Sequence, residues 1–498
     1  MEASEAGVSG ALAPTARAPA NADRSVLLAI GLITVIAMIS ALWGTRGMDP
    51  LRSDSASYIV FDPSRTVGYP AFIGLVRLVT GNPGLVVPAQ IVLLAASLMA
   101  LGRSFYDYTR RPVLAVVFQL ILISGIELWK LSAVLLTEAL AGAFVAFWCA
   151  QLLQALRAPT LSRLAVLVVL AAVATTVRPA LVALFLATAV AAFIVLPKPQ
   201  RARAFAIILS GFIVGWGATP VGQYLVHGSF RTTSPFARGV LQHTLFCEQP
   251  GTITDPDSQF VERSAAPARR YIEEAPAEFR SSLKRTYSGQ LRFGWIIPSL
   301  AQTHGMTAGW QTDPIMARVA AERLRANPSC YVGSVLAADY RMLTYGSSAR
   351  APGLRQYFAE HPPVATPSAP MAPADMRDAL HAGQMFHDEP AFEVPPQLKL
   401  EDRNPGFLMF AARLLFATAA VVGLLALIAL PFRCRLHRKL AEALPLAAVA
   451  AVAFHATIAA TAIVELGLSR YCAPLWPIMA VLIGVLLAGG RSGQRAAA

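Results

Sequence analysis

Ten apolar stretches, each close to the length that crosses a bilayer, alternate along the chain with short polar links. They cover residues 25–43, 83–102, 112–129, 131–154, 162–177, 179–196, 204–221, 406–430, 443–464 and 471–489. The first stretch exceeds the roughly 7–15 residues of a signal-peptide core, and no small-x-small cleavage site follows it, so we expect it to remain as a membrane anchor. This pattern predicts an all-α polytopic membrane protein with about ten transmembrane helices.

Composition agrees with this pattern and excludes an ordinary soluble fold. The 498 residues are 55% hydrophobic and 14% charged, with a mean hydropathy of +0.52, so one soluble domain could not bury the apolar surface. The net charge of +13 does not indicate nucleic-acid binding, because residues 222–404 carry 18 basic and 18 acidic side chains. The basic excess lies mostly in short links between apolar stretches, which is typical of membrane topology.

The basic links favour one orientation in the bilayer. A cytoplasmic N-terminus obeys the positive-inside rule, because it places these basic residues inside: Arg103, Arg110, Arg111, Arg157, Arg163, Lys198, Arg201, Arg203, Arg433, Arg435, Arg438, Lys439, Arg491 and Arg495. The same orientation places these acidic residues outside or at the outer edge: Asp49, Asp54, Asp62, Glu127 and Glu465. We therefore expect both termini in the cytoplasm.

The same pattern divides the chain into five parts. We expect a disordered cytoplasmic tail, an N-terminal bundle of about seven helices with an outer loop at 44–82, an extracytoplasmic loop domain, about three C-terminal helices and a second cytoplasmic tail. Their ranges are 1–24, 25–221, 222–404, 405–490 and 491–498.

The loop domain should be largely helical in its first part. Helical spacing runs through 258–289 and 313–345, and Asn327-Pro328 predicts a turn between two helices. The nine prolines between Pro352 and Pro396 predict an extended or disordered segment instead.

Two of the five cysteines, Cys247 and Cys330, share the loop domain. An oxidising compartment would allow them one disulfide, and two free thiols are the other outcome, because the sequence does not give their geometry. No Cys-x-x-Cys or histidine cluster indicates structural zinc.

The outer loop after the first apolar stretch holds a carboxylate close to the membrane surface, in Ser53-Asp54-Ser55-Ala56-Ser57-Tyr58. Asp54 is a candidate catalytic group, or it simply caps a short helix. Residues 69–80 are apolar on one side with Arg77 opposite, and Pro70 suits a first turn, so this segment predicts an interfacial helix.

Glu138 and two outer arginines are the other candidates. Glu138 either lies about 10 Å deep in a helix that begins at 131, as a functional intramembrane acid, or is a first-turn acid of a helix that begins near Val134. Arg178 and Arg470 could grip a phosphate, or could extend toward lipid head groups. A lone histidine such as His455 is more often a hydrogen-bonded core residue than a functional one. Arg413, like Glu138, is a charged residue within an apolar stretch and could be functional.

In combination these motifs resemble the GT-C class of integral-membrane glycosyltransferases, in the bacterial branch similar to protein mannosyltransferases and aminoarabinose transferases. The resemblance depends on five short motifs and on Asn327-Pro328-x-x-Tyr331, spread over most of 25–490. The five are Asp54-x-x-x-Tyr58, Arg65-x-x-Gly68-Tyr69-Pro70, Thr137-Glu138, Arg178-Pro179 and Arg470-Tyr471-x-x-Pro474-x-x-Pro477. Many relatives have Asp-Glu where this chain has Asp54-Ser55, and the Pro-rich segment matches no part of the class.

The resemblance implies an inverting transfer of a sugar from a polyprenyl-phosphate donor to an envelope lipid, glycan or protein, on the outer face of a bacterial cytoplasmic membrane. It assigns the general base to Asp54 and supporting roles to Glu138 and Tyr58. It assigns the donor phosphate to four cations, which are Arg178, Arg470, Arg65 and Lys130. A divalent metal is compatible with the class, and the sequence does not decide whether one is needed.

Two other function classes compete with this one. A transporter or flippase would line a path with Glu138, Arg413 and His455, but transporters often have internal repeats and the ionisable groups here cluster on the outer side. A non-catalytic scaffold would tolerate substitution of Asp54.

Overall fold

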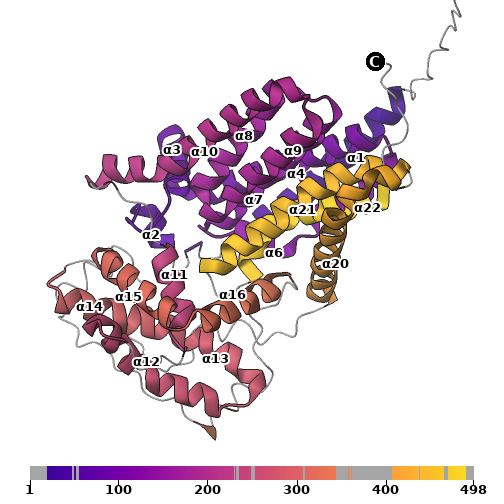
Figure 1. Ribbon diagram of the computed structural model, residues 1–498. Helices are drawn as coiled ribbons and strands as arrows, with labels where there is room; N and C mark the ends of the chain where they lie inside the picture. Colours follow the sequence, from indigo (N-terminus) through magenta and orange to yellow (C-terminus); the bar gives the residue numbers. More distant parts are fainter. Residues whose placement is uncertain are drawn as a thin grey trace, which may run out of the picture.

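Helices are the only regular elements in the described part of the chain, which agrees with the predicted all-α class (Figure 1). The computed structural model describes residues 20–46, 50–51, 55–228, 230, 235–247, 253–306, 309–343, 357, 360–361, 407–436, 438–464 and 469–488. Residues 1–19 and 489–498, Asp54 and most of the Pro-rich segment lie outside these residues, and so do Asp49 and Glu465. The predicted boundary of the N-terminal tail at residue 24 was wrong, because the first helix already begins at Ala20.

The first half of the chain forms ten α-helices. They are α1 (Ala20–Gly44), α2 (Ser55–Ile59), α3 (Gly68–Thr80), α4 (Val86–Thr109), α5 (Pro112–Ile123), α6 (Ile126–Ser132), α7 (Thr137–Arg157), α8 (Leu161–Val177), α9 (Ala183–Val195) and α10 (Lys198–His227). Two short 3-10 helices, η1 (Pro83–Leu85) and η2 (Pro179–Val182), lead into α4 and α9.

The rest of the described chain forms a group of shorter helices followed by three apolar ones. The shorter helices are α11 (Pro235–Thr244), α12 (Pro256–Glu274), α13 (Ala277–Gly289), the π-helical η3 (Gln290–Ile296), α14 (Ile297–Thr303), η4 (Gly309–Thr312), α15 (Asp313–Ala326) and α16 (Pro328–Leu343). The apolar helices are α20 (Phe407–Ala429), α21 (Arg438–Val464) and α22 (Trp476–Ala488), with η5 (Leu430–Arg435) and η6 (Ser469–Leu475) between them.

The number of spans differs from the ten expected. Every expected apolar stretch contains helix, but only seven described helices are long and apolar enough to cross a membrane, or eight if the bent pair α5–α6 is one span. The two remaining stretches form 161–177 and 179–195, which are shorter apolar helices. At 1.5 Å per residue, the 17 residues of α8 reach about 26 Å, less than the roughly 30 Å hydrocarbon core. Seven or eight of the about ten expected spans are therefore supported by helix length and composition, and the spans expected at α8 and α9 stay a prediction.

The 52° bend between α5 and α6 has a packing cause. A Cβ on Gly125 would lie 2.8 Å from the Trp476 ring, so only glycine allows this approach. The Trp476 indole also donates to the Ile121 carbonyl at 2.9 Å. The first residue of α22 thus occupies the break in the α5–α6 pair.

The described helices bury their side chains in two large cores. One core joins the apolar helices with α16 and includes Trp148, Phe105 and Phe454, and the other joins α11–α15 and includes Tyr287 and Met316. Figure 1 shows α11–α16 together at one end of the apolar helices. The described residues between 235 and 361 belong to the predicted loop domain, 222–404, and keep that name below.

The loop domain is helical in the two stretches predicted from the sequence. Helices α12 and α13 cover most of 258–289, and α15 ends at Ala326 where Asn327 leaves the helical conformation before Pro328. A disulfide joins Cys247 to Cys330, with Cα atoms 5.9 Å apart. The fully buried Arg323 pairs with Glu262 at 3.0 Å and donates to the Thr244 carbonyl at 2.9 Å.

Candidate functional site

Glu138 lies at the start of α7, between two arginines. Helix α7 begins at Thr137, so the position about 10 Å deep in a longer helix was wrong and the first-turn alternative is correct. The Glu138 side chain is nevertheless only 4% exposed. Its carboxylate lies 3.5 Å from Arg178 and 3.9 Å from Arg470. A carboxylate in the first turn is also stabilised by the helix dipole.

Tyr471 completes this cluster. The Arg178 guanidinium carbon lies 4.6 Å from the centre of the Tyr471 ring, and that of Arg470 lies 5.0 Å from it. Arg470 also donates to the Tyr471 hydroxyl at 3.2 Å. Cation–π contacts therefore restrict both guanidinium groups beside the carboxylate. We call Glu138, Arg178, Arg470 and Tyr471 the carboxylate cluster.

Arg178 owes its position to a break in the helical backbone. It follows α8 in an extended conformation, because the residue before a proline is disfavoured in helical geometry. The Thr66 hydroxyl donates to the Val177 carbonyl at 3.0 Å. Gly68, at the start of α3, lies so close to Thr176 that a Cβ would stand 2.6 Å from the Thr176 carbonyl carbon. The Gly68 motif therefore holds α3 against the end of α8 just before Arg178.

A hydrogen-bond network fixes the segment that leads into α7. The Tyr69 hydroxyl donates to Gln90 at 2.9 Å, and the Gln90 amide donates to the carbonyls of Ser132 and Val134, both at 2.7 Å. Burial, followed by the negative charge of Glu138 and by Tyr58, raises the pKa of Tyr69. The phenol therefore stays neutral and can donate.

The first outer loop meets the same segment. The Ser55 hydroxyl donates to the Leu135 carbonyl at 2.9 Å, and the Leu135 N–H donates to the Pro50 carbonyl at 2.9 Å. Asp54 lies outside the described residues, so neither its catalytic nor its capping role is tested. Helix α2 does begin at Ser55, immediately after it. Pro50 and Ser55, which lie on either side of Asp54, thus both bond to Leu135, three positions before Glu138.

Two further predicted residues, Arg65 and Tyr58, lie beside this network. Arg65 donates to Ser57 at 2.7 Å and stacks over Tyr58 at 4.6 Å, and the Tyr58 ring meets Tyr69 edge-on at 5.2 Å. Arg65 therefore contacts α2, while the carboxylate cluster contains Arg178 and Arg470.

Lys130 does not join the cluster in any described contact. Its ammonium pairs with Glu127 at 3.2 Å on α6, and its side chain is 66% exposed. An exposed pair of this kind is bonded weakly, so Lys130 is the least constrained of the four predicted cations.

The segment predicted as an interfacial helix is helical, and its place at the bilayer surface stays a prediction. Helix α3 buries Tyr69, Ile73 and Val76 and leaves Leu78, 83% exposed, beside the exposed Arg77. His455 is a hydrogen-bonded helix residue, because its ring donates to the Ala420 carbonyl at 3.2 Å. Arg413 is half-buried on α20.

Sequence reasoning missed two polar residues near the site. Gln90 is fully buried within an apolar stretch, and a lone amide there was the signal that could have found it. Asp339 lies on α16, and burial raises its pKa while the nearby His455 lowers it. The α16 backbone also reaches η6, since the Cys472 thiol meets the Met342 carbonyl at 3.4 Å.

The site offers charge and hydrogen-bond donors rather than a metal-binding set. Among the described residues, no group of three or more His, Cys, Asp or Glu side chains could hold a metal ion. The two arginines instead provide positive charge and N–H donors, which are the groups that bind an anion. Comparison with protein-family models, curated proteins and solved structures returns no match to this chain.

Proposed function

We propose that this protein is a membrane glycosyltransferase of the GT-C type. It transfers a sugar, with inversion, from a polyprenyl-phosphate donor to an acceptor on the outer face of a bacterial cytoplasmic membrane. The observation that carries the proposal is the carboxylate cluster, in which Glu138, Arg178 and Arg470 come from three distant segments. Seven or eight apolar helices able to span a bilayer give the lipid environment that such a donor needs.

The cluster matches the charge change of this reaction. The acceptor hydroxyl loses its proton to Asp54 as its oxygen attacks the anomeric carbon, and the bond from that carbon to the phosphate oxygen breaks. Polyprenyl phosphate leaves with the bonding electrons, so negative charge develops on its oxygen. Arg178 and Arg470 stabilise this charge, and Glu138 and Tyr471 hold the two guanidinium groups in place.

The hydrogen bonds around Leu135 support the role given to Asp54. Pro50 and Ser55 both bond to Leu135, and Leu135 precedes the Glu138 turn. These bonds bring the described residues on either side of Asp54 to the segment that leads into Glu138. These hydrogen bonds explain why the Asp54 motif and the Thr137-Glu138 motif, which are far apart in the sequence, can belong to one site.

The experiment compares envelope glycans and lipids by mass spectrometry in cells with and without the gene. We expect one glycoconjugate to disappear and its polyprenyl-phosphate sugar to accumulate in the deletion strain. Complementation with wild type or with Glu127→Gln should restore the product, and Arg178→Gln should not, because Arg178 belongs to the carboxylate cluster whereas Glu127 pairs with Lys130.

A purified-protein assay separates transfer from transport. Vesicles that contain the chain, a polyprenyl-phosphate sugar and the acceptor should yield a new glycosidic bond. Movement of the donor between leaflets without bond formation would instead establish a flippase, and an unchanged envelope in the deletion strain would refute both activities.

A further inference from the structure

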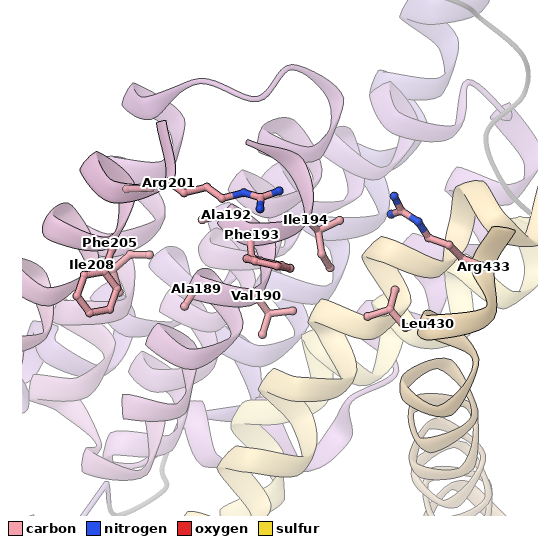
Figure 2. Close-up of a pocket in the computed structure, with 11 residues that line it drawn as sticks. Ala189, Val190, Ala192, Phe193, Ile194, Arg201, Phe205, Ile208, Leu430 and Arg433 are labelled. Atoms are coloured by element: carbon pink, nitrogen blue, oxygen red, sulfur yellow. The ribbon is translucent and has the colours of Figure 1, made fainter. Parts of the chain in front are cut away.

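A pocket of about 660 Å³ lies between α9, the first half of α10 and η5, and is distinct from the carboxylate cluster. Its walls are apolar, and Figure 2 shows Val190, Phe193, Ile194, Phe205, Ile208 and Leu430 around it. The volume falls within the roughly 300–1,000 Å³ typical of small-molecule sites. The pocket lies toward the end of α9, whereas Arg178 precedes the start of the same helix.

Two arginines mark one end of this pocket. The guanidinium of Arg201 stacks on Phe193 at 4.3 Å, and its Nε donates to the Leu196 carbonyl at 3.2 Å. Arg433 projects from η5, across the pocket from Arg201, and Figure 2 shows both guanidinium groups beyond the apolar side chains. The pocket therefore has an apolar body and a cationic mouth.

The charge at the mouth of the pocket indicates which class of ligand it binds. The lining includes two arginines and no acidic residue, so the mouth favours an anion. A small soluble anion would leave the apolar walls exposed, whereas an amphiphile covers both regions. Arg201 and Arg433 lie in links that the positive-inside rule assigns to the cytoplasm, where the leaflet is rich in anionic lipid.

We propose that this pocket binds one anionic glycerophospholipid, with its phosphate between Arg201 and Arg433 and an acyl chain along Phe193, Phe205 and Leu430. Because α9 and α10 belong to the N-terminal helices and η5 to the C-terminal ones, the lipid joins the two groups of apolar helices. This binding is independent of the proposed sugar transfer.

The experiment measures lipid binding to the purified full-length chain in detergent. Native mass spectrometry and thermal unfolding follow titration with phosphatidylglycerol or with phosphatidylcholine of the same acyl chains. We expect tight, saturable binding of one phosphatidylglycerol, at least tenfold tighter than phosphatidylcholine. The double variant Arg201→Gln/Arg433→Gln should lose this preference, and Ala189→Phe should weaken binding by filling the pocket.

A matched control removes two arginines outside the pocket. Arg103→Gln/Arg203→Gln has the same net charge as the test variant, and both positions are exposed. The preference should survive in this control within about twofold. If the test variant does not fold, Arg433→Gln alone, at an exposed position, gives the readout.

Three results would overturn the proposal. Equal binding of phosphatidylcholine would show that charge is not recognised. Equal loss in the Arg103→Gln/Arg203→Gln control would show a general surface effect. Inorganic phosphate that raised the unfolding temperature as much as the lipid, at the same phosphate concentration, would show a free-anion site rather than a lipid site.

Discussion

The Arg178 guanidinium lies 3.5 Å from the Glu138 carboxylate, although 40 positions separate the two residues in the chain. Arg178 is 12% exposed and Glu138 4%, so the pair is largely removed from water. Arg470 approaches the same carboxylate at 3.9 Å from a third segment. One acidic side chain therefore holds two cations that would otherwise repel each other.

The first prediction removes this acid. Glu138→Gln should reduce the free energy of unfolding by about 3–5 kcal/mol, because it leaves the buried Arg178 without its counter-ion. Transfer activity should fall as well, since neither guanidinium is then held in place. Thermal unfolding and the vesicle transfer assay measure the two effects.

Glu127→Gln is the matched control for Glu138→Gln. Its partner Lys130 is 66% exposed, so loss of this pair should change stability by less than about 1 kcal/mol. Equal effects of the two substitutions would mean that burial gives the Glu138 pair no special importance.

The second prediction tests the close approach of α3 to α8. Gly68→Ala adds a methyl group 2.6 Å from the Thr176 carbonyl carbon, so it should destabilise the fold by about 1–3 kcal/mol and reduce activity by shifting Arg178. Thermal unfolding and transfer are measured together.

Gly74→Ala, on the same helix, is the control for Gly68→Ala. Apart from its chain neighbours and the backbone of its own helix, no described atom lies within 4 Å of the added methyl group, and alanine favours a helix by about 1 kcal/mol over glycine. It should therefore be neutral or stabilising. A Gly68→Ala protein as stable and active as Gly74→Ala would contradict the packing that we assign to the motif.

The sequence predicted the elements better than the contacts between them. Apolar spacing located every long apolar helix, because burial in lipid or protein acts over a whole turn or more. It could not show that α8 and α9 are short, or that Arg178 reaches Glu138, because tertiary packing decides both. The spacing of Glu127 and Lys130, three positions apart on one helix, was a sequence signal that could have paired Lys130 with Glu127 rather than with the cluster.

The third prediction concerns the loop domain. Glu262→Gln removes the negative charge 3.0 Å from Arg323, whose side chain is fully buried. Burial lowers the pKa of Arg323 and Glu262 opposes this, so the variant should destabilise the domain by about 3–5 kcal/mol. Limited proteolysis between α11 and α15 measures this loss. Glu274→Gln, at an exposed position, should leave proteolysis unchanged, and equal cleavage of both variants would contradict the prediction.

The fourth prediction tests orientation. In a chain that lacks Cys149, Cys434 and Cys472, a membrane-impermeant thiol reagent on intact cells should label Ala277→Cys but not Ala158→Cys. Both positions are exposed, so access to the reagent depends on the side of the membrane. Ala277 belongs to the loop domain and Ala158 to a basic link. Labelling of Ala158→Cys alone would reverse the orientation and place the carboxylate cluster on the cytoplasmic side.

The last prediction tests the general base. Asp54→Asn keeps the size of the side chain but cannot accept a proton, so transfer should fall by about 10²–10⁴-fold. Stability should stay near wild type, because Asn caps a helix about as well as Asp, and α2 begins at the next residue.

Asp54→Ala separates the two roles, since it removes the base and the cap together. It should lower activity as far as Asp54→Asn and also reduce the free energy of unfolding by about 1 kcal/mol. Activity that survives in Asp54→Asn but falls in Asp54→Ala would assign Asp54 to capping alone, and Glu138 would be the next carboxylate to test as the base.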